Sequence, residues 1–302
     1  MQQLAIAIPP DNPASHISGF LDSLESLIDP DLWSMRPVYL DEGPADDNRW
    51  LRDHAERGGS VIWYFARPQD CAMIRRLTDS GNAVVTYNRD YREHGAHAVI
   101  ADVEEVVRQQ FERLWRPGKR RFAVLSTDRP SPSIRQYRKL AEELAIRAGV
   151  GEAFRQVRLP YAAKQRPSEE MLAQIDALMS SDPPPDAVMC TDIFSFRGLE
   201  VWLAKHRHVR VPEDLGVATF DPVPYANVQR LNHQIPMGMM DQPRMLQAAI
   251  RMLETHQCNP QPQPQLQRIP ATMAGDVRAT VTPIGIRLTR PTAATAACAP
   301  AS

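Results

Sequence analysis

Short apolar runs alternate with segments of helical periodicity along most of the chain. A continuous apolar run between turn signals is typical of a strand buried on both faces, and apolar residues at every third or fourth position are typical of an amphipathic helix. Strand-like runs occupy residues 4–8, 38–40, 60–66, 83–87, 98–103, 121–126, 153–159, 187–190 and 215–220. Helical periodicity occupies residues 15–27, 46–57, 70–80, 104–114, 133–148, 168–180 and 196–206. This regular alternation predicts βα units and an α/β fold with parallel sheets.

The alternation pauses at residues 98–103 and then begins again, so we expect two parallel sheets of similar architecture. After the second sheet, the pattern predicts a crossing strand at residues 235–240, a helix at 243–256 and another crossing strand at 266–269. Residues 286–302 are rich in Ala, Thr and Pro, and we expect this tail to be disordered.

The composition narrows the class of protein. With 302 residues, of which 43% are hydrophobic, the chain can bury a sizeable core in each of two units. The net charge of −1 argues against binding of nucleic acid by this chain alone. No apolar run reaches about 18 residues, which argues against a membrane span, and the first residues lack the cationic start of an export signal. The four cysteines are scattered, so we expect reduced thiols in a cytoplasmic protein.

Polar and aromatic residues follow the predicted strands at their carboxyl ends, where open α/β sheets bind ligands. Two such sheets facing each other across a hinge would enclose a ligand between these ends. A mixture of carboxylates, amides, guanidinium groups and aromatic faces suits a hydroxyl-rich ligand such as a sugar. The alternative is that these are the ordinary turn residues of any α/β sheet. The candidate ligand-binding residues are Asp11, Phe65, Asn88, Arg135, Thr191, Asp192, Asp221 and Gln242.

Catalytic and metal-binding signatures are missing from the sequence. It contains no serine nucleophile elbow, no phosphate-binding loop and no GxGxxG motif. Asp192 and Asp221 could in principle form an acid–base pair, but nothing nearby supplies a nucleophile. His94 and His97 have HxxH spacing, yet Gly95 between them indicates a loop and argues against a preformed metal site. We therefore expect no enzyme, no catalytic residue, no metal and no cofactor.

Four segments resemble motifs of the lactose-repressor (LacI/GalR) family of bacterial transcriptional regulators. The strongest likeness is residues 210–221, RVPEDLGVATFD, which are similar to the segment that ends the family's core. Residues 84–89 (VVTYNR), 131–135 (SPSIR) and 185–192 (PDAVMCTD) resemble three other family motifs in the same order. Gln242 and the proline after it also stand where the family has its Gln-Pro pair. The resemblance covers about residues 4–280.

The resemblance implies a fold of two Rossmann-like parallel-sheet subdomains joined by three crossovers, as in type I periplasmic binding proteins. The first subdomain would hold residues 1–101 and 241–268, and the second would hold residues 102–240 and 269–285. On the matching positions, Arg135 and Asp221 would hold the hydroxyl groups of an effector. Three further matching positions would contribute contacts, namely Asn88, Thr191 and Gln242.

The chain also departs from the family's pattern. Asn88 stands where the family often has Asp, and Thr191 stands where it usually has Asn, so the effector of better-known members does not carry over. Several arginines near strand ends leave a phosphorylated or acidic sugar open, although such residues are often simply solvated. These arginines are Arg67, Arg89, Arg135 and Arg244.

The first predicted strand begins near Leu4, with no helix-turn-helix unit before it. The first hypothesis is therefore the effector-sensing and dimerising core of a cytoplasmic LacI-type regulator or repressor. It would be a homodimer that binds a small sugar or derivative between its lobes and contacts operator DNA only through a helix-turn-helix absent from this chain. The alternatives are a stand-alone sugar-binding protein without a DNA-binding role, or an enzyme on the same scaffold.

Overall fold

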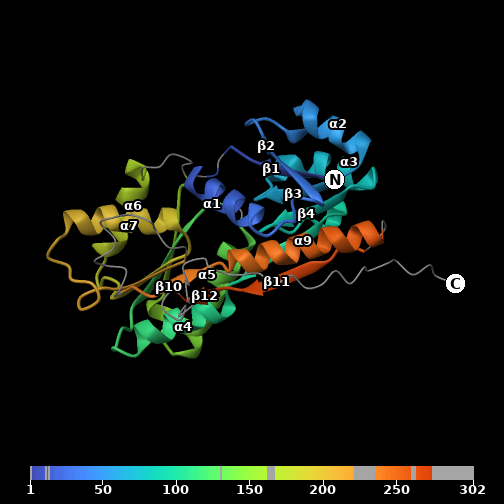
Figure 1. Ribbon diagram of the computed structural model, residues 1–302. Helices are drawn as coiled ribbons and strands as arrows, with labels where there is room; N and C mark the ends of the chain where they lie inside the picture. Colours follow the sequence, from blue (N-terminus) through green and yellow to red (C-terminus); the bar gives the residue numbers. More distant parts are fainter. Residues whose placement is uncertain are drawn as a thin grey trace.

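The computed structural model describes residues 2–10, 12, 14–129, 131–161, 167–220, 235–259 and 263–273. Within these residues the chain forms two six-stranded sheets, which we call sheet A and sheet B (Figure 1). Sheet A contains, in spatial order, β11 (Leu266–Pro270), β5 (His97–Asp102), β4 (Ala83–Tyr87), β3 (Ser60–Tyr64), β1 (Gln2–Ile8) and β2 (Trp33–Tyr39). Sheet B contains β12 (Thr272–Met273), β10 (Met237–Met239), β9 (Gly216–Phe220), β8 (Ala187–Cys190), β6 (Phe122–Thr127) and β7 (Arg155–Leu159).

Neighbouring strands are parallel throughout both sheets, except that β12 runs antiparallel to β10. The predicted α/β fold with two parallel sheets is confirmed. The α-helices are α1 (Ala14–Glu25), α2 (Arg49–Arg57), α3 (Cys71–Asp79), α4 (Glu104–Trp115), α5 (Pro132–Arg147), α6 (Glu169–Met179), α7 (Ile193–Lys205) and α9 (Gln242–Cys258). Short 3₁₀ turns are η1 (Ala45–Asp47), η2 (Pro68–Asp70), η3 (Arg92–His94) and η4 (Gly151–Ala153).

Helices cover both faces of each sheet. In β1, Leu4 and Ile6 pack in one apolar core with residues of α1 and α9, whereas Ala5 and Ala7 pack in another with residues of α2 and α3. Sheet B divides its strand residues in the same way between a core with α6 and α7 and a core with α4 and α5. Because successive side chains of a strand point to opposite faces, burial on both sides requires continuous apolar runs. This is why the runs in the sequence predict the strands well.

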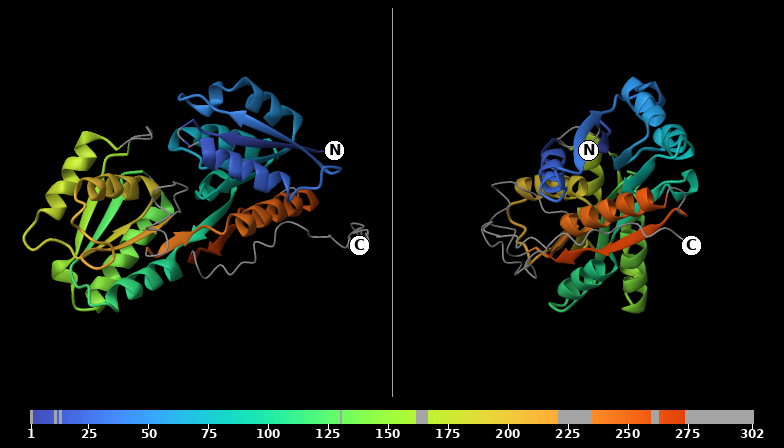
Figure 2. Two further views of the ribbon diagram at one scale, coloured as in Figure 1. Left: turned by 60° about the vertical axis from the view of Figure 1, so that its left-hand side comes forward. Right: turned by 45° about the vertical axis from the view of Figure 1, so that its right-hand side comes forward.

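Within the part of the chain that the structure describes, the backbone passes between the two sheets three times, as predicted. Only Val103 separates β5 from α4, only Met240 and Asp241 separate β10 from α9, and only Ala271 separates β11 from β12. Sheet A with α1, α2, α3 and α9 forms the first lobe, and sheet B with α4 to α7 forms the second. Figure 2 shows the lobes side by side, with α9 and β11 along the side where they join. The predicted subdomain boundaries stay predictions, and the tail of residues 286–302 lies outside the described residues.

Several predicted elements have different ends in the structure, and local capping explains two of them. The helix predicted at residues 46–57 is a 3₁₀ turn followed by α2, because the side chain of Asn48 accepts a hydrogen bond from the Leu51 backbone N–H at 3.0 Å and starts a new helix. Helix α7 begins three residues before the predicted residue 196, since Asp192 caps it. The weak strand predicted at residues 38–40 is the longer edge strand β2, in which Pro37 interrupts the apolar pattern.

Within the described parts of the chain, none of the helices has both the length and the apolar character needed to cross a membrane.

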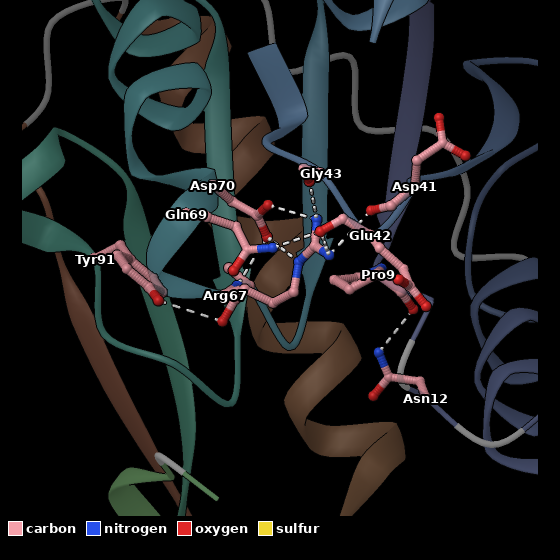
Figure 3. Close-up of polar contacts among 10 residues, drawn as sticks. Pro9, Asn12, Asp41, Glu42, Gly43, Arg67, Gln69, Asp70 and Tyr91 are labelled. Carbon is pink, nitrogen blue, oxygen red and sulfur yellow. Dashed lines mark hydrogen bonds and ion pairs between the residues drawn. The ribbon is translucent and has the colours of Figure 1, made fainter. Parts of the chain in front are cut away.

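An arginine whose side chain is 11% exposed ties together the loops that follow β2 and β3 (Figure 3). The guanidinium group of Arg67 donates to the backbone oxygens of Asp41 at 3.0 Å and Gly43 at 3.1 Å. It also forms an ion pair of 2.9 Å with Asp70, whose side chain is fully buried. The Asp70 carboxylate in turn accepts from the Arg67 backbone N–H at 2.8 Å. Arg67 is therefore part of the scaffold at the carboxyl end of sheet A.

Replacing Arg67 with methionine should lower the free energy of unfolding by about 3–5 kcal/mol, because the Asp70 carboxylate would stay buried without its cation. Urea denaturation of the wild type and the variant measures this difference. The matched control is Arg92→Met, which removes a surface ion pair with Asp90 and should change stability little. Equal effects of the two substitutions would contradict the scaffold role of Arg67.

Candidate functional site

A cavity lies between the two lobes, at the carboxyl ends of strands from both sheets. Its volume is about 50 Å³. From the first lobe it is lined by Asn12, His16, Tyr64, Phe65, Asn88 and Arg89. From the second lobe its polar lining is Arg129, Ser131, Ser133, Thr191 and Asp192. The predicted meeting of strand ends from two sheets therefore exists in the structure, and four of the eight candidate residues take part in it.

Phe65 is held in an unusual backbone conformation at the end of β3. Its φ angle is 50°, in the left-handed region that residues other than glycine rarely adopt. A backbone hydrogen bond to the Tyr87 oxygen at 3.1 Å fixes this turn. The ring packs edge-on against Tyr64, with ring centroids 4.7 Å apart. The turn thus places in the cavity lining an aromatic ring, which is a group that can cover the C–H groups of a sugar.

Asn88 ends the neighbouring strand β4 in the same way. Its φ angle is 56°, and its backbone N–H donates to the Val99 oxygen at 2.7 Å. Only 3% of the residue is exposed. Its amide makes long contacts of 3.4 Å each, donating to the sulfur of Met240 and accepting from the Ala101 backbone N–H. Sulfur is a weak acceptor, so the Asn88 amide could turn to a ligand hydroxyl at small cost.

Asp192 lines the cavity, but its carboxylate is saturated by the protein itself. One oxygen accepts from the backbone N–H groups of Phe194 and Ser195, both at 2.9 Å, and so caps α7. The other oxygen accepts from the hydroxyl of Thr127 at 2.9 Å and that of Thr191 at 3.0 Å. A carboxylate offers about four acceptor sites. Asp192 therefore anchors the wall of the cavity, and the hydroxyl of Thr191, whose proton is used here, has only acceptor capacity left.

Arg135 and Gln242 lie outside the lining of the cavity. Arg135 is exposed on α5, because the buried stripe of this helix runs through Ile134, Tyr137 and Ala141 and does not include Arg135. The Gln242 amide instead joins α9 to α1, donating to the Gly19 oxygen at 3.1 Å and to the Ser23 hydroxyl at 3.0 Å. Their predicted contacts with an effector stay predictions.

The remaining two candidates, Asp11 and Asp221, lie outside the described residues, so their predicted roles also stay predictions.

Two arginines bring positive charge to the cavity, and sequence reasoning passed over one of them. Arg89, which is 6% exposed, donates to the Ser131 hydroxyl of the second lobe at 3.3 Å. Arg129 donates to the Asn12 amide oxygen of the first lobe at 3.2 Å. Arg129 comes two residues after the end of β6, so its position at a strand end was the available signal. Both side chains connect the lobes through the site.

The pKa of His16 reflects the burial and the positive charge of this region. Burial lowers the pKa of the imidazole from its ordinary value, and the nearby charges of Arg129 and then Arg197 lower it further. These effects favour the neutral imidazole, because both a low dielectric and neighbouring cations disfavour a second positive charge.

The two histidines of the HxxH spacing have different neighbours. His94 contacts Arg75, with 3.3 Å between their nitrogens, whereas His97 contacts His256, with 3.4 Å between ring nitrogens. Among the described residues, no group of three or more His, Cys, Asp or Glu side chains could hold a metal ion.

Comparison with known proteins identifies relatives in fold. The profile of the family described as "Periplasmic binding protein-like domain" matches residues 111–280. Among solved structures, the chain is similar to a LacI transcriptional regulator from Rhodococcus species, with 16% sequence identity and a TM-score of 0.73 over 90% of this chain and 96% of the other. A search of curated proteins found no match.

Two further solved structures are similar to this chain. One is the LacI family transcriptional regulator CCPA from Weissella paramesenteroides with bound glucose, at 16% identity and a TM-score of 0.68 over 90% of this chain and 96% of the other. The other is GanP, a glucose-galactose binding protein from Geobacillus stearothermophilus, at 14% identity and a TM-score of 0.68 over the same shares. At such identities the likeness shows a shared fold, which regulators and binding proteins have in common.

Replacing Asp192 with alanine should lower the free energy of unfolding by about 3 kcal/mol, because five buried donors, which include the backbone N–H of Thr127 at 3.3 Å, would lose a charged acceptor. Thermal and urea denaturation measure this loss. The matched control is Ser168→Ala at the N-cap of α6. The Ser168 side chain accepts one hydrogen bond, from the backbone N–H of Met171, and its loss should lower the free energy of unfolding by about 1 kcal/mol. A loss for Asp192→Ala no larger than that of the control would show that the carboxylate is not the anchor.

Proposed function

The chain belongs to the periplasmic binding protein-like domain family, and on this basis we propose that it is the effector-binding core of a LacI-type transcriptional regulator. The ligand is a sugar or a sugar-like metabolite bound between the two lobes. The observation that carries this proposal is the cavity at the strand ends of both sheets, lined by an aromatic ring, an amide and several hydroxyl groups. The likeness to a LacI family regulator with bound glucose supports the same ligand class.

The lining matches the chemistry of a sugar. The ring of Phe65 can cover a C–H face, the amide of Asn88 can both donate to and accept from hydroxyls, and the oxygen of Thr191 can accept. Hydroxyl groups of Ser131 and Ser133, which lie 2.9 Å apart, add donors and acceptors from the second lobe. A sugar bound here would touch both lobes at once.

Binding between the lobes would couple to their relative arrangement. Ligand pockets are typically roughly 300–1,000 Å³, far above the 50 Å³ enclosed here, so a sugar has to separate the lobes to enter. Entry would disturb contacts between lobes, such as that of Arg89 with Ser131 and that of Gln136 with Asp102, which is 3.0 Å. A ligand that binds one arrangement better than the other shifts the population of that arrangement.

Dimerisation and DNA binding are properties of the regulator as a whole. We propose that the core acts as a cytoplasmic homodimer, and that the lobe movement changes how two DNA-reading heads are spaced on an operator. Such heads place a helix in the major groove, and their spacing sets which half-sites the dimer can contact. A repressor would result if the binding-competent spacing is that of the effector-free core.

A second candidate is a sugar-binding protein without a DNA-binding role, which the likeness to GanP favours. An enzyme is the third possibility, and we propose instead that the bound sugar leaves unchanged. Product analysis of each ligand after prolonged incubation with the protein distinguishes binding from turnover, since any conversion above the protein-free rate would favour the enzyme.

A panel of neutral sugars, sugar acids and sugar phosphates should contain compounds that raise the melting temperature of the protein. At a hundred times the dissociation constant, a ligand stabilises the folded state by about 2.7 kcal/mol. Phe65→Ala should weaken the binding of every such compound about tenfold in calorimetry, because the ring covers the ligand. Tyr39→Ala, at an exposed aromatic residue of β2, is the control and should leave affinity unchanged. A panel without any hit would contradict the proposed function.

Light scattering after size exclusion should give about twice the 34.0 kDa mass of the chain, as a dimerising regulator core requires. The stand-alone binding protein predicts the mass of one chain, so a monomer over a wide range of protein concentration would favour that second candidate.

A further inference from the structure

Two guanidinium groups from different lobes lie against the same aromatic ring of the cavity. The central carbon of Arg89 is 5.1 Å from the centroid of the Phe65 ring, and that of Arg129 is 5.3 Å from it. Arg89 follows β4 in the first lobe, and Arg129 follows β6 in the second. Arg129 also lies 5.3 Å from the ring centroid of Tyr161. The Phe65 ring thus contacts one cation from each lobe.

The cavity wall adds to this positive potential. Helix α5 starts at the cavity with Ser131, whose side chain makes no capping bond, and it has no acidic residue in its first turn. The partial positive charge of a helix N-terminus therefore faces the same space. The other helix that starts here, α7, is different, because one oxygen of the Asp192 carboxylate caps it.

The other arginines singled out in the sequence have different surroundings. Arg67 is bonded to the loops after β2 and β3, whereas Arg135 and Arg244 are exposed and outside the lining of the cavity. The positive charge in the described lining thus comes from Arg89 and Arg129, with His16 beside them.

We propose that the effector carries an anionic group, a carboxylate or a phosphate, and that Arg89 and Arg129 hold this group beside Phe65. This inference rests on the proposed function, since it names the class of ligand for the same cavity. Two guanidinium groups match the oxygens of a carboxylate or a phosphate through charge-assisted hydrogen bonds.

The test compares sugars that differ only in charge. Calorimetry is carried out with D-glucose, D-gluconate and D-glucose 6-phosphate, and with D-ribose, D-ribonate and D-ribose 5-phosphate. At least one anionic compound should bind ten or more times more tightly than its neutral parent, and the two arms distinguish a carboxylate from a phosphate. Neutral parents that bind as tightly as their anionic forms would overturn the inference while leaving the proposed function intact.

Inorganic phosphate tests the anion site separately from the sugar ligand. Stabilisation by phosphate, without a response to any sugar, would support the anion site and contradict the sugar ligand. A lack of response to all seven compounds would overturn both.

Substitutions of Arg129 test whether this residue binds the anionic group of the effector. Arg129→Met should remove at least tenfold of the affinity for the anionic compound and change the affinity for the neutral parent less than twofold, while Arg129→Lys should recover part of the loss. Arg52→Met, at an exposed residue of α2, is the matched control and should have no effect. A far-ultraviolet spectrum and a melting temperature like those of the wild type show that the variants fold. An equal loss for neutral and anionic compounds in Arg129→Met would contradict the assigned role.

Discussion

Burial of both faces of both sheets is the constraint on which the rest of the structure depends. Residues at successive positions of β1 pack in two different apolar cores, so the strand has no face left for polar groups. Chemistry can then enter only where the strands end. Parallel strands bring all their carboxyl ends to one edge, and two such edges facing each other create the cavity. The polar residues of the site are a consequence of a fold that leaves room for them at the strand ends.

The same constraint explains how much of the fold could be predicted. Continuous apolar runs such as residues 60–66 and 83–87 marked the strands, and the restart after residues 98–103 marked the second lobe. Exact ends could not be predicted, because they depend on single side chains acting at a distance of two or three residues. Asp192 moves the start of α7, and the left-handed turn at Phe65 ends β3 two residues before the apolar run does.

The location of the candidate site could be predicted from the sequence, but only some of the residues that line it could. Phe65, Asn88, Thr191 and Asp192 line the cavity because position at a strand end is a property of the sequence. Whether a side chain one helical turn later faces the cavity depends on the residue at which the helix begins, and this put Arg135 on the solvent side of α5. The bonding partners of a carboxylate are likewise invisible in a sequence.

The three crossings between the lobes have a mechanical consequence. Each consists of one or two residues, namely Val103, the pair Met240 and Asp241, and Ala271. The backbone N–H of Ala271 also donates to the Asp102 oxygen at 2.8 Å, which ties two of these crossings together. Three short connections held side by side resist stretching and sliding, and they yield only through torsion of a few backbone bonds. These connections therefore favour rotation of the lobes about an axis near Ala271, and a small rotation about that axis moves the far ends of the lobes through a larger distance than it moves the residues beside it.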